Sequence, residues 1–360
     1  MMFIQLIVTF ILFLTKQVIG NEILGCNGFI KSPIELNFSA IEIKLLTKQG
    51  SLKDRTECAP NNGYFFLPVY DKGEYILRVS PPNGWVFEPA EVALNVDGVS
   101  DSCSQGKDIY FYFRGFSVIG KVVSIDNTIG PKGVRVQLWE EHKQALDSLK
   151  TFSTLSTDDG SFEFSSVMPG TYHVQASHSS WMFLKDQVID FKVTNDSYII
   201  PINSLIIAGY EVSGSVTSDK EPIKGVRFIL FSKGKSVKVK GCDNFTLQNF
   251  NQAGLGLDDA TLICHVASDE KGSFVFPCVP PGEYIIVPYY RAVEANYIKF
   301  DVHPQSLPIS VSHNSLKIDT PFKVEGFSVS GRVLYSSEGE PYSGASVYLN
   351  DKSVTETRSD

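Results

Sequence analysis

Two adjacent carboxylates, Asp158 and Asp159, stand in the segment TDDGSFEF (residues 157–164), where they could either bind a calcium ion or shape a turn. Calcium needs six or more oxygen ligands, and the neighbouring residues supply few. The segment recurs as NNGYFF at residues 61–66 and as EKGSFVF at residues 270–276, so the acidic pair is not kept. A shared metal role would have lost its ligands, whereas Asp, Asn and Gly all favour turns. We therefore predict a turn.

Other candidates for chemistry are weaker. The sequence contains no GxSxG, no HExxH and no SxxK with its partners. The tripeptide Gly234-Lys235-Ser236 resembles the end of a phosphate-binding loop, but Ile229 stands where that motif needs its first glycine. His173 and His178 share a predicted strand at an odd spacing, which directs them to opposite faces and excludes joint metal binding. We predict no enzyme activity, no cofactor and no catalytic or metal-binding residue.

Three tryptophans, Trp85, Trp139 and Trp181, could stack on sugar rings, because an aromatic face packs against the apolar face of a pyranose. Trp85 and Trp181, the candidate sugar-stacking pair, occupy corresponding places in two repeats. Such recurrence favours a core-filling role over ligand binding.

The first residues predict a secretory signal peptide over residues 1–20. Phe3 to Thr15 is almost uninterrupted apolar sequence, shorter than the roughly 20 residues of a membrane span. The alternative is a signal anchor that is never cleaved. No later apolar run is long enough to span a membrane, so the fragment as given is expected to be soluble after cleavage.

The cysteines, sequons and charge agree with a secretory compartment. Six cysteines suggest disulfides, and three sequons are possible glycan acceptors. The acceptor residues are Asn37, Asn195 and Asn244. The net charge of −8 for the whole chain disfavours nucleic acid or an anionic bilayer surface as a partner.

Internal repeats then show which elements must position these residues. A glycine followed by an aromatic residue and alternating apolar residues recurs from Gly115, Gly209 and Gly326, with a degenerate copy at Gly28. In the segment that contains the turn, two glycines lie ten residues apart in each of three copies, which predicts a strand of set length between two turns. These turns need a residue at positive φ, which glycine adopts easily.

The repeat lengths predict tandem all-β domains, each the size of a seven-stranded immunoglobulin-like or carboxypeptidase-regulatory-like (prealbumin-like) β-sandwich. After each Pro/Gly turn, alternating residues indicate a half-buried strand. The expected divisions are a signal peptide over 1–20, sandwiches over 21–113, 114–207 and 208–324, and the start of a fourth over 325–360. The glycines at 115, 209 and 326 are expected to lie in linkers. The fourth repeat stops where the pattern next requires Gly, Ser and Phe, so we expect a fragment.

Local features refine this plan. The third repeat contains an insertion near 234–262, which a Cys242–Cys264 disulfide would close. Cys58, paired with Cys103 or with Cys26, would staple the first sandwich and leave Cys278 free. Residues 138–149 have helix-like spacing, although the other repeats predict a β-hairpin there.

Long phrases of the sequence resemble the amino terminus of the nodal modulator (NOMO) family. They include CNGF (26–29), CAPNNGYF (58–65), GWVFEP (84–89) and AGYEVSGSV (208–216). The resemblance covers essentially the whole chain after the leader. It implies a type I single-pass protein of the endoplasmic reticulum membrane, whose lumenal part is a series of such sandwiches and whose anchor would lie in a C-terminal part absent here.

The resemblance also implies a function. Family members are non-enzymatic subunits of a complex with nicalin and a small multipass membrane protein, which joins the translocon subunits that insert multipass membrane proteins. The expected role is therefore a lumenal scaffold or spacer acting through protein contacts. The alternative is a carbohydrate-binding β-sandwich module. An enzyme rests on no motif here.

Overall fold

The computed structural model describes residues 24–141, 151–184, 188–234, 237–244, 257, 259–289, 300–327, 331–336, 339–349 and 351–357. They form an all-β structure of β-sandwiches, as the sequence predicts. The contacts divide the chain into two compact units. Unit 1 comprises Met1–Lys121, Lys132–Ala176 and Gln187–Ser204, and unit 2 comprises Val122–Pro131, Ser177–Asp186 and Leu205–Asp360. The predicted signal peptide lies outside the described residues.

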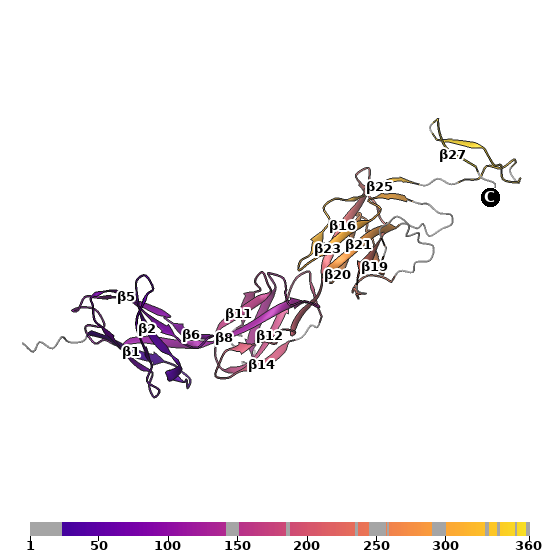
Figure 1. Ribbon diagram of the computed structural model, residues 1–360. Helices are drawn as coiled ribbons and strands as arrows, with labels where there is room; N and C mark the ends of the chain where they lie inside the picture. The colour runs from indigo at the N-terminus through magenta and orange to yellow at the C-terminus, as the bar shows by residue number, and fades with distance from the viewer. Residues whose placement is uncertain are drawn as a thin grey trace, which may run out of the picture. The chain divides into compact units, whose positions relative to one another are not determined.

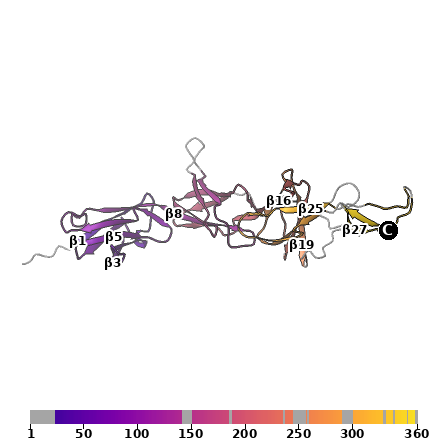
Figure 2. The ribbon, with the colours of Figure 1, turned by 90° about the horizontal axis from the view of Figure 1, so that it is seen from above.

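The first sandwich, in unit 1, has two sheets (Figure 1). One sheet has the order β3-β2-β5-β7 and consists of β2 (Glu42–Thr47), β3 (Leu52–Glu57), β5 (Gly73–Ser80) and β7 (Glu91–Val96). The other contains β1 (Leu24–Lys31), β4 (Tyr64–Val69), β6 (Trp85–Glu88) and the start of β8 (Ile109–Ser124). A short 3-10 helix, η1 (Phe38–Ala40), precedes β2. Strands β1 and β3 therefore belong to opposite sheets (Figure 2).

The second sandwich repeats this plan. Its four-stranded sheet has the order β10-β9-β12-β14 and consists of β9 (Arg135–Glu140), β10 (Phe152–Leu155), β12 (Gly170–Ser177) and β14 (Ile189–Val193). On the opposite side, β8 pairs with β11 (Ser161–Val167) and β15 (Tyr198–Ile199). The helix suggested for residues 138–149 is wrong for its first three residues, which belong to β9. The first of them, Leu138, pairs with Phe152 of β10. Residues 142–150 lie outside the described residues.

The third sandwich lies in unit 2. Its four-stranded sheet, β19-β18-β21-β23, consists of β18 (Arg227–Lys233), β19 (Ala260–Ala267), β21 (Gly282–Tyr289) and β23 (Leu307–Val311). The facing strands are β13 (Met182–Phe183), β16 (Leu205–Ser218), β17 (Glu221–Pro222), β20 (Ser273–Val279), β22 (Phe300–His303), β24 (Leu316–Lys317) and β25 (Phe322–Phe327). Between the sheets, the rings of Phe228 and Phe274 stack with centroids 3.7 Å apart. A hairpin of β26 (Ser346–Leu349) and β27 (Lys352–Glu356) follows.

The insertion of the third repeat builds a second core. Strand β18 was expected to be half-buried, but Ile229 and Phe231 are as buried as their inward-facing neighbours. They cluster with Leu257 of the insertion and with Ile285 and Val287 of β21. The expectation fails because Leu257 of the insertion packs on the outer face of this sheet, and both faces of β18 are buried.

The glycines expected in linkers instead lie inside continuous strands. Gly115 belongs to β8, Gly209 to β16 and Gly326 to β25. A Cβ on Gly209 would lie 2.7 Å from carbonyl carbons of β20, and one on Gly115 would lie 2.6–2.7 Å from the backbone at Ser166 and Val167. Glycine is needed there because a neighbouring backbone approaches closely, and not because the chain is loose.

The turn before each ten-residue interval has the conformation that the sequence predicts. Gly63, Gly160 and Gly272 have φ values of 70°, 86° and 68°. The second glycine of each interval begins a strand instead of sitting in a left-handed turn: residues 73, 170 and 282 start β5, β12 and β21. A turn and a following strand thus repeat in all three sandwiches.

Candidate interaction surface

The adjacent carboxylates Asp158 and Asp159 form hydrogen bonds and ion pairs at the turn between residues 157 and 161. Asp159 accepts hydrogen bonds from the Thr157 hydroxyl (2.8 Å), from Ser161 N (3.1 Å) and from Ser161 Oγ (2.9 Å). It also forms an ion pair with Lys121 at 3.0 Å. The Thr157 hydroxyl and the Lys121 ammonium hold the pKa of the Asp159 carboxyl well below its usual range. Asp158 points to Lys132, with 2.9 Å between the charged atoms.

The other copies close the same turn with different residues. Asn62 Oδ1 accepts from Tyr64 N at 3.1 Å. In the third repeat, Asp269 Oδ1 accepts from Lys271 N and Ser273 N at 2.9 and 2.8 Å. The side chain that caps the turn changes position between copies, while the turn is kept. Within the described ranges, no group of three or more His, Cys, Asp or Glu residues could hold a metal ion.

The two histidines of the second repeat take separate structural partners. His173 Nδ1 lies 2.6 Å from Asp190 Oδ1, on the neighbouring strand β14. His178 lies beyond the end of β12 and stacks on Trp181, with ring centroids 3.6 Å apart. The prediction that both histidines lie on one strand is therefore wrong, because β12 ends at Ser177.

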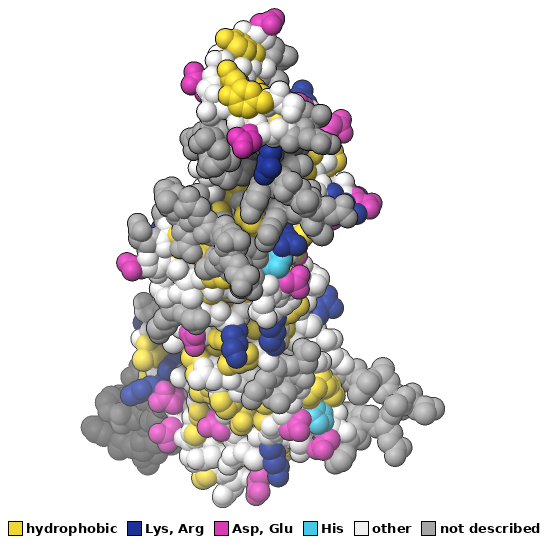
Figure 3. Space-filling model, turned by 90° about the vertical axis from the view of Figure 1, so that its right-hand side faces the viewer, with side chains coloured by type: hydrophobic (Ala, Val, Ile, Leu, Met, Phe, Trp, Pro, Cys, Tyr) yellow, Lys and Arg dark blue, Asp and Glu magenta, His cyan; other side chains and the backbone are white. Residues whose placement is uncertain are grey.

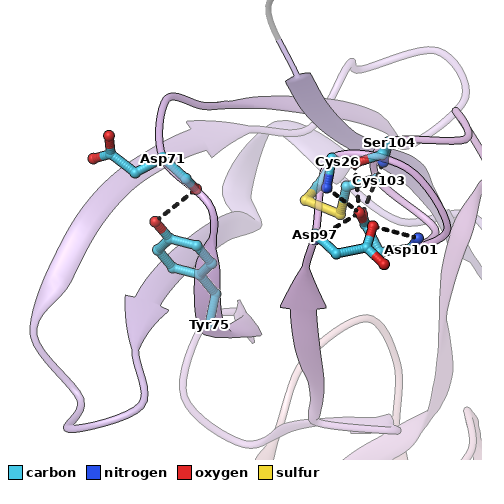
Figure 4. The surroundings of a disulfide bond; sticks show 8 residues. Cys26, Asp71, Tyr75, Asp97, Asp101, Cys103 and Ser104 are labelled. Atoms are coloured by element: carbon cyan, nitrogen blue, oxygen red, sulfur yellow. Dashed lines mark hydrogen bonds between the residues drawn. A yellow bond between two sulfur atoms is a disulfide. The ribbon is translucent and has the colours of Figure 1, made fainter.

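The disulfide of the first sandwich differs from the expected pairing. Cys26 on β1 bonds to Cys103 (Figure 4), while Cys58 remains a buried free thiol. Cys103 lies in a loop whose backbone amides donate to the Asp97 and Asp101 carboxylates, and this loop delivers Cys103 to β1. Burial raises the pKa of the Cys58 thiol to about 12, so this thiol is unreactive.

The second disulfide joins Cys242 to Cys264, the pair expected to close the insertion. Cys278 on β20 is a buried free thiol whose pKa is raised by burial. Cys278 and both bridged cysteines line a cavity of about 690 Å³ in unit 2. Its walls are mostly apolar and include Ile125, Leu184 and Ile263. This cavity was not foreseen, because its walls come from distant segments of the chain.

A tyrosine in each repeat ties the strand after the second glycine to the preceding turn. Tyr75 Oη donates to the Asp71 carbonyl at 3.0 Å (Figure 4), Tyr172 to Met168 at 2.9 Å and Tyr284 to Pro280 at 2.9 Å. In every case the acceptor lies four residues earlier. This tyrosine corner is a known device of β-sandwiches. It gives the recurrent Gly-x-Tyr sequence a structural role.

The tryptophans considered for sugar stacking are engaged by the protein. Trp181 is only 9% exposed, with His178 stacked on its ring. Trp85 is half-buried and packs edge-on against Phe113 and Phe116. Trp139 lies against His173, with centroids 5.6 Å apart. None of these contacts favours a sugar site.

The sequon asparagines, by contrast, are all exposed. Asn37 precedes the short helix η1, Asn195 follows β14, and Asn244 lies in the insertion. Thr246, the last residue of the third sequon, lies outside the described residues.

The first sandwich also has an exposed aromatic surface that the sequence did not predict. Phe29, Tyr64, Tyr110 and Tyr112, here called the aromatic stripe, adjoin one another on the outer face of β1, β4 and β8. Successive ring centroids lie 5.3–6.3 Å apart. Lys31 Nζ lies over the rings of Phe29 and Tyr110, and Arg114 over that of Tyr112. The alternation of tyrosine and phenylalanine in residues 109–114 is the signal that could have revealed it.

The stripe has the composition of a protein-binding surface. The tyrosines at 64, 110 and 112 are 37–45% exposed. Arg114 is also paired with Glu88 at 2.9 Å. Tyrosine and arginine are enriched in the cores of protein interfaces. Among the described residues on the face shown in Figure 3, by comparison, acidic and basic side chains are scattered and gather into no patch of one sign.

Comparison with known proteins gives three successive family matches. Residues 27–111 match "BOS complex subunit NOMO1-like, first beta sandwich domain", and residues 113–208 match the corresponding second beta sandwich domain. Residues 210–325 match "NOMO third transthyretin-like domain".

Curated relatives agree with these matches. The mouse protein "BOS complex subunit NOMO1" is 47% identical over 347 residues, which cover 96% of this chain and 28% of the relative. The human protein "BOS complex subunit NOMO1" is 47% identical over 344 residues, 95% of this chain and 27% of its own length. "Nicotinic receptor-associated protein 4" of Caenorhabditis elegans is 29% identical over 351 residues, which cover 94% of this chain and 28% of the relative. The chain thus spans about a quarter of the length of these relatives.

Among solved structures, the major pilin subunit BcpA of Bacillus cereus aligns over 84% of this chain and 99% of its own, with 15% identity and a TM-score of 0.25. None of the helices in the part of the chain that the structure describes has the length and hydrophobicity of a membrane span.

Proposed function

The chain belongs to the NOMO-like family of BOS complex subunits, and from this premise we propose that it is a non-enzymatic scaffold and spacer on the lumenal side of the endoplasmic reticulum membrane. The observation that carries the proposal is the succession of three family domains, in order, over residues 27–325. The chain would contribute length and docking faces instead of a reaction centre.

The contacts inside the sandwiches support a structural role. The side chains that first suggested chemistry, Asp159, His173 and the bridged cysteines, each stabilise a turn, a strand pair or a loop. Two disulfides and three exposed sequon asparagines suit an oxidising, glycosylating compartment.

The partners expected for this scaffold are nicalin, a small multipass membrane protein of the same complex and translocon subunits, with which it would support the insertion of multipass membrane proteins. The membrane anchor would belong to a part of the protein outside this chain. The aromatic stripe is our candidate docking face, since its tyrosines are exposed and Lys31 and Arg114 lie over rings of the stripe.

The test is affinity purification of the complete native protein from gently solubilised endoplasmic reticulum membranes, followed by mass spectrometry. We expect nicalin and translocon subunits to be recovered with it. Recovery of a secreted protein without these subunits would contradict the proposal and revive the carbohydrate-binding alternative.

A further inference from the structure

A hydrogen bond in unit 1 crosses from the first repeat to the second. The indole Nε1 of Trp85 donates to Asp196 Oδ1 at 3.0 Å, although the two residues are 111 positions apart. The same indole meets Phe116, the aromatic residue that follows Gly115, edge-on with centroids 5.6 Å apart and an interplanar angle of 78°. Trp85 also pairs with Phe116 in the register between β6 and β8. The tryptophan of one repeat is therefore held by two elements of the next.

The same arrangement recurs inside unit 2 with different residues. Trp181 Nε1 donates to Ser315 Oγ at 2.8 Å. Its ring meets Tyr210, the aromatic residue that follows Gly209, with centroids 5.2 Å apart and an interplanar angle of 77°. Met182, the next residue after Trp181, pairs with Gly209 in the register between β13 and β16. The angles at the two sites differ by one degree.

The acceptors also correspond. Asp196 lies just before β15, which pairs in parallel with β8, and Ser315 lies just before β24, which pairs in parallel with β16. The residue after each short strand continues the pairing with the long strand. Ile200 N donates to Ile119 O of β8 at 2.9 Å, and Ile318 N donates to Ser213 O of β16 at 2.8 Å. The acceptor differs in type and by one position, since Asp196 lies two residues before β15 and Ser315 one residue before β24, but both belong to the turn that leads into the short parallel strand.

We propose that Trp85 is a docking residue, whose ring and N–H together fasten the first repeat to the second within unit 1. Trp181 makes the corresponding contact within unit 2. A core-filling residue would need only neighbours from its own repeat. At both Trp85 and Trp181, the N–H acceptor and the edge-on aromatic partner belong to the following repeat in the sequence. The docking contact combines an aromatic pair with a hydrogen bond from the indole N–H. Without this hydrogen bond, the half-buried N–H would have no protein partner.

The unit 1 contact is closely fitted. Ser117 N donates to the Gly84 carbonyl at 2.6 Å, beside the tryptophan. Gly84 has a φ of 81°, and a Cβ on it would lie 2.6 Å from the Ser197 Cβ. The residue before the tryptophan therefore approaches the loop that provides the acceptor, so the contact extends over Gly84, Trp85, Asp196 and Ser197.

Hydrogen exchange of the whole chain tests the proposal at the Ile200 amide, which lies in the second repeat. Trp85→Phe keeps an aromatic ring but removes the donor, and Asp196→Ala removes the acceptor from an exposed loop, so both variants should fold. We expect either substitution to speed exchange at Ile200 about tenfold. Asp196→Asn, which retains an oxygen acceptor, should restore most of the protection. Trp139→Phe serves as the matched control and should leave Ile200 unchanged.

A double-mutant cycle distinguishes docking from local packing. If the residues act together, Trp85→Phe combined with Asp196→Ala should speed exchange no more than either change does by itself. In unit 2, Trp181→Phe and Ser315→Ala should behave likewise at the Ile318 amide. The proposal is overturned if Trp85→Phe accelerates exchange only within residues 73–88, or if the effects of the two changes multiply.

Discussion

The Ser124 hydroxyl and the Nδ1 atom of His313 lie 2.7 Å apart in unit 2, although 189 residues separate them in the chain. Ser124 Oγ also lies 2.5 Å from Tyr210 Oη, so three polar groups from three segments meet within a largely apolar environment. Burial lowers the pKa of His313 and raises that of Tyr210 to about 12. All three groups are therefore neutral near pH 7.

This cluster predicts acid sensitivity of unit 2. Burial also lowers the pKa of His178, so both histidines bind protons less readily in the folded chain than in the unfolded chain, where the pKa is 6.5. The unfolded state then binds more protons, and stability is lost as the pH falls below about 6.5. Thermal unfolding between pH 5 and 8 should show this fall. His313→Gln should flatten the dependence, and an unchanged slope would show that His313 does not contribute.

Gly209→Ala should destabilise unit 2 by at least about 3 kcal/mol, because the new Cβ would clash with the backbone of β20. Denaturant unfolding would measure the change. Gly331→Ala is the matched control: a Cβ there meets nothing within 4 Å, so the expected change is within about 0.5 kcal/mol. Equal effects at both positions would mean that the close approach of β20 is relieved by a small backbone shift.

Replacing both Cys242 and Cys264 with Ala should lower the free energy of unfolding by about 3 kcal/mol, because the unfolded chain would no longer be restrained by a loop of this length. The loss should appear first over the insertion, since the second core formed by Ile229, Phe231 and Leu257 depends on its position. Proteolysis near residue 257 should accelerate, while the first sandwich stays resistant. Unchanged cleavage would indicate that the apolar contacts hold the insertion by themselves.

The aromatic stripe should matter for assembly and not for folding. Tyr110→Ala together with Tyr112→Ala removes two exposed rings, so stability should change by less than about 1 kcal/mol. Recovery of partner subunits in affinity purification should fall severalfold. Leu155→Ala, an exposed residue on the second sandwich, is the control. Undiminished recovery would place the docking face elsewhere.

Each of the sequon asparagines should carry a glycan, since Asn37, Asn195 and Asn244 are exposed. Changing them singly to Gln should produce one mobility step per site, abolished by enzymatic deglycosylation. A site whose variant migrates like the parent protein is unoccupied.

Much of the fold follows from local sequence patterns. Period-two alternation and the fixed spacing between Gly63 and Gly73 predict strands and turns, because both depend on near neighbours in the chain. The insertion disulfide follows from the two cysteines that bracket an interruption of the repeat. The turn role of Asp159 follows from comparing copies of one segment.

What the sequence did not predict depends on contacts between distant segments. The partner of Cys26 is set by a loop that the Asp97 carboxylate folds, and local spacing says nothing of it. The outer face of β18 is buried in a cluster that includes Leu257 of the insertion, which no strand pattern encodes. Gly115 looks like a linker residue until β11 is placed beside it. The aromatic stripe needs three strands to be put side by side.

The continuity of β8 through Gly115, and of β16 through Gly209, has a mechanical consequence. A flexible linker lets a pulled chain straighten before any folded part bears the load. Here the residues at each boundary are already extended and bonded to neighbouring strands, so tension would reach the ladder hydrogen bonds with no slack to take up first. Within unit 1, where β8 runs from the first sandwich into the second, stretching would therefore be resisted until the hydrogen bonds of a sandwich break.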